Sequence, residues 1–213
     1  MLIERDVILA WIREIAKVIA ENKEYLTQLD SAIGDADHGA NMDRGFQKVI
    51  EKMPEYADKD IGGIFKAVGM QLLSSVGGAS GPLYGSLFIQ IGTKSAGKHA
   101  LNLEDWSDAL EAGVGSVMAR GKAEPGDKTM VDALLPAVRA LRDALDNQAD
   151  LDQALKASAM AARQGMLSTI PLVARKGRAS YLGERSAGHQ DPGATSSFMI
   201  LQALANLVIN KSL

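Results

Sequence analysis

The sequence predicts an all-α fold, a single-domain antiparallel barrel or bundle of about eight amphipathic helices. Apolar residues recur three and four positions apart along most of the 213 residues, which is the period of one helix face. The alternation typical of strands is scarce, and aromatic residues make up only 5% of the chain. No low-complexity linker or internal repeat divides the sequence, so residues 1–213 are expected to form one domain.

Each expected helix has its own apolar face. The clearest runs are Ile8, Trp11, Ile15 and Val18; Ile61, Ile64, Val68 and Leu72; Leu103, Trp106, Leu110, Val114 and Val117; Leu134, Val138, Leu141 and Leu145; and Leu151, Leu155, Ala159 and Ala162. Pro136 is expected to kink its helix near the start, because proline cannot donate to the preceding turn. The expected helices are, in order, residues 4–21, 40–53, 61–74, 81–97, 103–119, 131–146, 151–166 and 194–210.

The seven connections between these helices alternate in character. Three are short and plain: residues 54–60, 98–102 and 146–150. The four connections at residues 28–40, 74–82, 120–130 and 167–193 are rich in Gly, Asp, Ser, Thr, His and Arg. Alternate connections of an antiparallel bundle lie at the same end. The four rich loops are therefore expected to meet at one end and to build a composite site there.

Composition narrows the function classes. Lys and Arg number 23 against 26 Asp and Glu, and the net charge of −3 argues against general nucleic-acid binding. There is no cysteine, which excludes disulfides, thiolate nucleophiles and cysteine-bound zinc, and suits a reducing cytoplasm. The N-terminus does not resemble a signal peptide, and no apolar stretch approaches the roughly 20 residues that cross a membrane. A cytoplasmic protein without membrane contact is expected.

The first rich loop places Asp30, Asp35 and Asp37 within eight positions. Such short carboxylates repel one another unless a cation lies among them, and Mg²⁺ takes carboxylate and phosphate oxygens as ligands. The alternative is a solvated acidic turn. His38 follows directly and offers three roles: a donor to phosphate, a covalent phosphoryl acceptor, or a helix-capping side chain.

The other rich loops offer groups that suit phosphate. Small residues from Ser74 to Pro82, with the Ser80 hydroxyl, form a plausible phosphate cradle or a close turn between helices. In the third loop Thr129 could cap the next helix, and Met130 could contact a nucleobase or belong to the core. The fourth loop carries Arg175, Arg178, Arg185 and His189, with surface solvation as the alternative, and Asp191-Pro192-Gly193 resembles a helix start.

Several common catalytic motifs are excluded. Gly92–His99 nearly matches a phosphate-binding P-loop, but His99 stands where a Ser or Thr must follow the Lys. Gly97-Lys98-His99 instead indicates the C-terminal end of a helix. The chain has no HExxH or GxSxG motif, and its three histidines lack metal-ligand spacing, so a zinc or serine hydrolase is not expected.

Taken together, the loops resemble the family of ADP-binding L subunits of phosphotransferase-system (phosphoenolpyruvate-dependent) dihydroxyacetone kinases. The resemblance spans nearly the whole chain and rests on four separate loops. Its motifs are Leu29-Asp30, Ile33–Gly39, Gly77–Pro82, Arg120–Met130, Arg175–Arg185 and His189–Ala194.

The resemblance implies an antiparallel barrel of eight helices with a nucleotide at one end. Two Mg²⁺ ions would bridge the diphosphate of ADP and would be held by Asp30, Asp35 and Asp37. The nucleotide would contact His38, Gly39, Ala40, Asn41, Ala79, Ser80, Gly121, Met130, Arg178, Asp191, Pro192 and Gly193.

The resemblance also implies a kinase subunit whose tightly bound ADP acts as a cofactor. A phosphohistidine-bearing M subunit would convert ADP to ATP in place, and the γ-phosphoryl would pass to dihydroxyacetone on a separate K subunit, giving dihydroxyacetone phosphate. Two alternatives stay open: an ATP-exchanging kinase domain with a separate substrate-binding subunit, and a nucleotide-state sensor that acts on a transcription regulator. The second would not bind nucleic acid directly.

Overall fold

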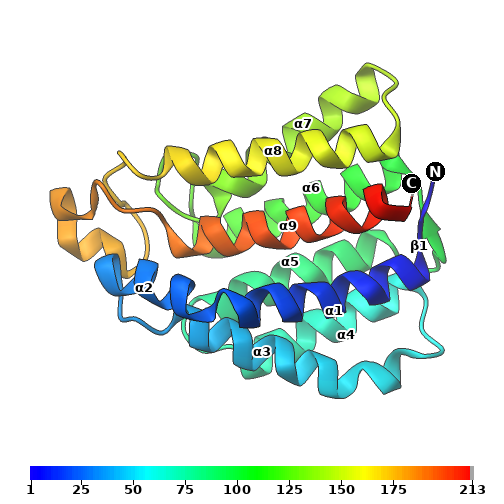
Figure 1. The fold of residues 1–213 in the computed structure, drawn as a ribbon, viewed down its shortest axis with the longest axis horizontal. Coiled ribbons are helices and arrows are strands. Elements are labelled where there is room, and N and C mark those ends of the chain that lie inside the picture. The colour runs from blue at the N-terminus through cyan, green and yellow to red at the C-terminus, as the bar shows by residue number, and fades with distance from the viewer. Residues whose placement is uncertain (212–213) are drawn as a thin grey trace.

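The structure, a computed structural model, describes the backbone of residues 1–211 and the side chains of residues 1–209. These residues form nine α-helices, two short 3₁₀-helices and one pair of two-residue strands (Figure 1). The elements are β1 (Ile3–Glu4), α1 (Arg5–Glu21), α2 (Lys23–Ile33), α3 (His38–Lys52), η1 (Met53–Tyr56), α4 (Ile61–Ser75), α5 (Ser80–Lys94), β2 (Ala100–Leu101), α6 (Leu103–Gly121), α7 (Val131–Asp146), α8 (Leu151–Ser168), η2 (Arg178–Ser186) and α9 (Pro192–Lys211).

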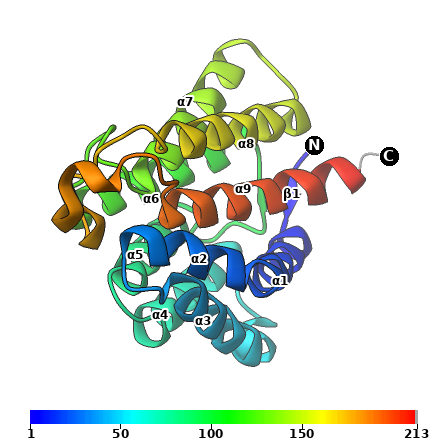
Figure 2. The same ribbon diagram turned by 60° about the vertical axis from the view of Figure 1, so that its left-hand side comes forward.

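Eight of the helices close into a barrel. Each packs against its neighbours in the order α1, α3, α4, α5, α6, α7, α8, α9, and α9 returns to α1 (Figures 1 and 2). Consecutive helices of the barrel run in opposite directions, as in an antiparallel bundle (Figure 1). The predicted all-α antiparallel barrel of about eight helices is confirmed.

One helix was absent from the sequence analysis. Helix α2 follows α1 after a single break at Asn22 and extends it past the rest of the barrel (Figure 1). Because α2 continues in the direction of α1, the alternation of loops between the two ends is preserved. Its buried side chains are only Leu26, Asp30 and Ile33, so its sequence offers only two apolar positions of a helix face.

Two shorter features also differ from expectation. Strands β1 and β2 pair antiparallel beside the N-terminus, although the sequence showed no strand pattern there. The fourth rich loop was expected to lack regular structure, but it contains η2. Pro136 lies inside α7, which continues as one helix through it.

Aromatic side chains from several helices meet at the centre of the barrel. Trp11 contacts Trp106 edge-on, with ring centroids 5.5 Å apart, and contacts Phe65 edge-on at 6.0 Å. Its indole Nε1 donates to the carbonyl of Ile200, 2.8 Å away. Such aromatic pairs stabilise a core beyond the area that they bury. The cluster thus joins α1, α4, α6 and α9 from the inside.

Helices α4 and α5 approach each other closely through facing glycines. A Cβ on Gly62 would lie 2.7 Å from the carbonyl oxygen of Gly92, and one on Gly69 would lie 2.7 Å from that of Gly85. Neither pair leaves room for a methyl group. These four glycines therefore allow backbone contact between the two helices.

Helix α9 is long and apolar enough, over Pro192–Ile209, to meet the length and composition of a membrane span. No such stretch was expected from the sequence. However, 61% of this window is buried inside the barrel, where α9 packs on α1 and α8. This burial is typical of a core helix, because a helix that neighbours cover on several sides is apolar around most of its circumference.

The two ends of the barrel differ. The four rich loops, residues 34–37, 76–79, 122–130 and 169–191, lie at one end, here called the pocket end. The plain connections lie at the other, the terminal end, with the N-terminus and the last described turn of α9 (Figure 1). The prediction that the four rich loops share one end is confirmed.

Candidate functional site

An open pocket occupies the pocket end, and all four rich loops contribute to its lining. The lining residues come from the end of α2, from the starts of α3, α5 and α9, from the loop that precedes α7, and from η2 with the residues before it. They include Asp30, Asp35, Asp37, His38, Ala79, Ser80, Tyr84, Lys128, Met130, Arg178, Asp191, Pro192 and Gly193. Residues that lie up to 163 positions apart thus face one space.

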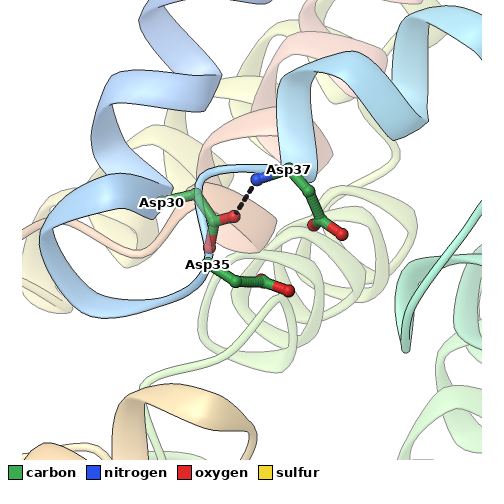
Figure 3. Close-up of side chains that lie close together, drawn as sticks. All are labelled: Asp30, Asp35 and Asp37. Carbon is green, nitrogen blue, oxygen red and sulfur yellow. Dashed lines mark hydrogen bonds between the residues drawn. The ribbon is translucent and has the colours of Figure 1, made fainter.

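The three carboxylates converge at the pocket. One oxygen from each of Asp30, Asp35 and Asp37 lies within 4.8 Å of the others. Figure 3 shows the side chains of Asp35 and Asp37 extending in the same direction, while the Asp30 carboxylate turns toward the backbone of Asp37. Three carboxylates on one short segment form a donor set that suits a hard divalent cation such as Mg²⁺.

The backbone of this turn is built around Asp30. Its Oδ2 accepts from the N–H groups of Asp37 (2.8 Å) and His38 (3.1 Å), which orients the first turn of α3. A Cβ on Gly34 would lie 2.1 Å from Asp30 Oδ1, so only glycine fits there. Ala36 adopts the left-handed conformation with φ of 60°. The turn thus brings Asp35 and Asp37 around to the buried Asp30.

Arg178 supplies a positive charge to this cluster. Arg178 belongs to η2 in the fourth loop, and its Nη2 lies 3.0 Å from Asp35 Oδ2 in the first loop. The Arg178 side chain is 66% exposed, so the ion pair contributes little to stability. Its position nevertheless places a guanidinium at the mouth of the pocket, where it can bind phosphate oxygens.

His38 is buried between two hydroxyl groups. Its Nδ1 lies 3.1 Å from Ser80 Oγ, and its Nε2 lies 2.8 Å from Ser196 Oγ. Burial lowers the pKa of His38 from 6.5 to about 4, although the carboxylates of Asp30 and Asp37 act in the opposite direction. The imidazole is therefore neutral at physiological pH, with both ring nitrogens in hydrogen bonds.

The hydrogen bonds that hold Ser196 in place beside His38 were not predicted from the sequence. The Tyr84 hydroxyl contacts Ser196 Oγ (2.7 Å) and Ser197 Oγ (2.8 Å), and it donates to the carbonyl of Gly193 (3.1 Å). Burial raises the pKa of Tyr84 to about 12, so it stays protonated. The signal available in the sequence was the polar run from Thr195 to Ser197 inside an otherwise apolar helix.

Asp191 starts α9 at the edge of the pocket, as the sequence analysis expected. Its Oδ2 accepts from the N–H of Ala194 (2.7 Å), and Pro192 is the first helical residue. Burial raises the pKa of Asp191 to about 7, with Asp132 adding to the effect while the Ala194 bond and Lys128 oppose it. A buried carboxyl at the start of a helix thus titrates close to neutrality.

Lys128 was not singled out from the sequence, yet it lines the pocket and is only 1% exposed. Burial lowers its pKa, against the opposing effect of Asp191 and Asp132. Its ammonium group donates to backbone carbonyls of the fourth loop rather than to a side chain. A buried lysine with such partners is held in one position.

Some expected residues lie elsewhere. Gly39 packs against the carbonyl of Lys23 in α2, and Gly121, at the end of α6, lies beside Leu83. Asn41 accepts a hydrogen bond from Arg44. These residues contribute to packing around the pocket and do not line it. Ala40, Arg175, Arg185 and His189 are also outside the lining.

Expected helix boundaries can be checked near the site. Thr129 was expected to cap α7, and its Oγ1 does accept from Val131 N (3.2 Å), although Met130 is the residue that precedes the helix. Gly97 adopts φ of 76° just past α5, as expected for a helix end. The expected role of Gly92–His99 as a helix terminus rather than a P-loop is thus consistent with the structure.

Comparison with known proteins agrees with this geometry. The DAK2 domain family matches residues 32–206. The chain is 51% identical over 205 residues to the PEP-dependent dihydroxyacetone kinase, ADP-binding subunit DhaL, of Escherichia coli strain K12, covering 96% of this chain and 98% of that protein. It is 42% identical over 203 residues to the PTS-dependent dihydroxyacetone kinase, ADP-binding subunit DhaL, of Lactococcus lactis, covering 95% and 97%.

A solved structure shares the fold. The dihydroxyacetone kinase of C. freundii in its native form superposes with a TM-score of 0.71 at 26% identity, covering 92% of this chain and 33% of that one. The same kinase has been solved in complex with AMP-PNP and Mg²⁺, with a TM-score of 0.69. The barrel described here is thus similar to one part of a longer kinase. The chain belongs to the DAK2 domain family, in the group of ADP-binding subunits of PEP-dependent dihydroxyacetone kinases.

Proposed function

We propose that this chain is the nucleotide-carrying subunit of a PEP-dependent dihydroxyacetone kinase and holds ADP as a resident cofactor. A phosphohistidine-bearing M subunit converts the bound ADP to ATP, and the γ-phosphoryl then passes to dihydroxyacetone on a K subunit. The observation that carries the proposal is the convergence of four loops around three carboxylates whose oxygens lie within 4.8 Å of one another. The 51% identity to a DhaL subunit supports the choice of reaction.

The carboxylate cluster is proposed to hold two Mg²⁺ ions through Asp30, Asp35 and Asp37. When bound, such ions neutralise phosphate charge and align the oxygens that attack and leave. The fit rests on the hard oxygen donors and on the turn that gathers them. A longer relative that contains this fold has been solved in complex with AMP-PNP and Mg²⁺, which supports this assignment.

The remaining lining residues are proposed to bind the nucleotide. Ser80 and His38 lie at the starts of α5 and α3, where free backbone N–H groups and the helix dipoles favour phosphate. Arg178 faces the same space from η2 and adds a cation. Met130, which is buried beside the pocket, offers an apolar surface for the base.

His38 is proposed to hold the Ser80 hydroxyl beside the phosphate and not to carry phosphate covalently. Both of its ring nitrogens already bond serine hydroxyls, which leaves neither free to attack phosphorus. Phosphoryl transfer also depends on positioning and charge neutralisation more than on a protein nucleophile. A covalent role would require the His38 ring to leave Ser80 or Ser196.

The partners of the chain follow from the proposed reaction. The pocket is assigned to the nucleotide, so dihydroxyacetone must be presented by the K subunit at the pocket mouth. We place the protein in the cytoplasm, where PEP-derived phosphoryl groups are available, as a single domain over residues 1–213. Binding to a transcription regulator is the alternative role for the same nucleotide site.

The first test is to purify the protein without added nucleotide, desalt it extensively, denature it and quantify what is released. The proposal predicts near-stoichiometric ADP in the wild-type protein, and its loss when the protein is first treated with a chelator of divalent cations. An empty protein that exchanges ATP freely would instead indicate an ATP-dependent kinase domain. Failure to bind either nucleotide would contradict the site itself.

A further inference from the structure

The long fourth loop, residues 169–191, carries Arg178 and ends at Asp191, so its position decides the shape of the pocket. Few contacts hold the tip of this loop. A small apolar cluster of Ile33, Ala174 and Ala179, with Leu182 beside it, joins η2 to α2. The only charged contact of the tip among the described residues is the exposed Arg178–Asp35 pair, which contributes little. The constraint on the loop must therefore come from its base.

Lys128 lies at that base. Its Nζ donates to the carbonyl oxygens of Thr169 (2.6 Å) and Ile170 (3.4 Å), where the loop leaves α8, and to that of His189, where the loop returns to α9. One ammonium group thus joins both ends of the loop. Bonds from Gly188 N to the carbonyl of Ile170 (2.7 Å) and from Asp191 N to Thr169 Oγ1 (3.0 Å) close the same base.

The backbone conformation around Lys128 directs its side chain to the base of the fourth loop. Lys128 adopts φ of 62°, a left-handed conformation that is unfavourable for a residue with a side chain. Asp132 stabilises this turn by accepting from the N–H groups of Gly126 (2.5 Å) and Thr129 (2.8 Å). Asp127 contributes its carbonyl to Arg175 N (3.1 Å), so the third loop contacts the fourth at a second point.

A lysine in a phosphate pocket would ordinarily be assigned to the phosphate. An ammonium group has three N–H donors, and here three carbonyl oxygens accept from it. No donor is left for a ligand while the loop stays closed. The geometry points to Lys128 as a positioning residue that holds the loop closed over the pocket and thereby sets how long ADP stays bound. The part of this inference that concerns ADP rests on the proposed function.

The test compares the wild-type full-length protein with Lys128→Met, which keeps the length of the side chain and removes the ammonium group. Lys122→Met is the matched control, because Lys122 belongs to the same loop and has a left-handed φ of 49° but is exposed. Hydrogen exchange is measured on the nucleotide-free proteins. The release rate of a fluorescent ADP analogue is measured with Mg²⁺ present.

We expect Lys128→Met to release the analogue about tenfold faster or more, as for lost hydrogen bonds to a charged group, while Lys122→Met matches the wild type. Exchange should rise in residues 171–187 of the nucleotide-free Lys128→Met protein, and amides of α1 and α4 should not change. If Lys128→Met does not fold, Lys128→Gln, which keeps two N–H donors, should show the same pattern with smaller changes.

Three results would overturn the inference. Unchanged release would show that the base does not control the bound nucleotide. Faster release with unchanged exchange in residues 171–187 would make Lys128 a phosphate ligand. Faster exchange throughout the barrel would give it a merely structural role. Wild-type protein that binds no ADP contradicts the proposed function instead, and the exchange measurement still tests how the loop is held.

Discussion

The two ends of the barrel are built from the same helices, but their polar side chains have different roles. At the terminal end, side chains mainly complete the backbone. Asp60 accepts from the N–H of Gly63 (2.7 Å) and also from that of Gly97, and Asn102 and Asp105 form a reciprocal capping box at the start of α6. Arg5 donates to carbonyls of residues 56, 57 and 59. These polar groups serve to stabilise helix ends and turns.

At the pocket end, the burial of polar groups lowers the free energy of unfolding. Asp191 is held where its pKa rises to about 7, His38 where its pKa falls to about 4, and three carboxylates face one another. Desolvation and like charge both oppose such an arrangement. The contrast indicates that the terminal end and the core stabilise a barrel whose other end is organised for a charged ligand. Three changes test this division.

The largest effect is expected from Asp35→Ala. Loss of one of three carboxylates should weaken Mg²⁺-dependent ADP binding at least about 100-fold and abolish phosphoryl transfer in the system reconstituted with K and M subunits. Stability should change little, because the variant also removes repulsion within the cluster. Calorimetry of ADP binding and thermal unfolding measure the two quantities. Asp58→Ala, an exposed carboxylate at the terminal end, is the control, and full transfer by Asp35→Ala would disprove its ligand role.

Gly62→Ala, at the terminal end, should have the opposite effect: it should lower stability without changing ADP binding. Its Cβ would lie 2.6 Å from Ala96 Cα, so α4 and α5 must separate, at a cost of about 1–3 kcal/mol in the free energy of unfolding. ADP affinity should be unchanged while the protein is folded. Gly115→Ala in α6 is the control, since nothing lies within 4 Å of its Cβ position and it should stabilise the helix by about 0.5–1 kcal/mol. Equal effects of the two changes would contradict close packing at Gly62.

The third change concerns pH. The folded pKa of Asp191 is about 7, against 3.8 ordinarily, so the folded state binds the proton more tightly. The stability contributed by this group is therefore present at low pH and is lost as pH rises from about 4 to about 7, by about 1.4 kcal/mol for each pH unit within that range. Asp191→Asn cannot titrate but still caps α9. The stability of the wild type relative to Asp191→Asn should therefore fall over this range.

Chemical unfolding of the metal-free proteins at about pH 4.5 and about pH 7.5 measures this difference. Asp60 provides the contrast from the terminal end. Hydrogen bonds from Gly63 and Gly97 lower its pKa, so its contribution to stability is lost only as pH falls below the ordinary range. The stability of the wild type relative to Asp60→Asn should stay constant between the two pH values. A pH-independent difference for Asp191→Asn would show that its carboxyl ionises normally in the folded protein.

Much of the architecture follows from local pattern. Apolar residues at helical spacing locate the eight barrel helices to within a few residues, because the period of one helix face is a property of neighbouring residues. Alternate connections of an antiparallel bundle lie at the same end, so the order of loops alone places Asp35, Ser80, Met130 and Asp191 together. Helix α2 was missed because it buries few side chains and projects beyond the barrel.

The role of each polar group depends on folding. The sequence located Asp30, Asp35 and Asp37 as a cluster and His38 beside them, since these residues are close in the chain. The partners of His38 lie 42 and 158 residues away, and those of Lys128 lie 41 to 61 residues away. Hydrogen-bond partners and burial depend on segments that meet only in the folded barrel. Local pattern therefore accounts for the barrel and for the location of the site, whereas long-range packing selects which residues face the ligand and which hold the site in shape.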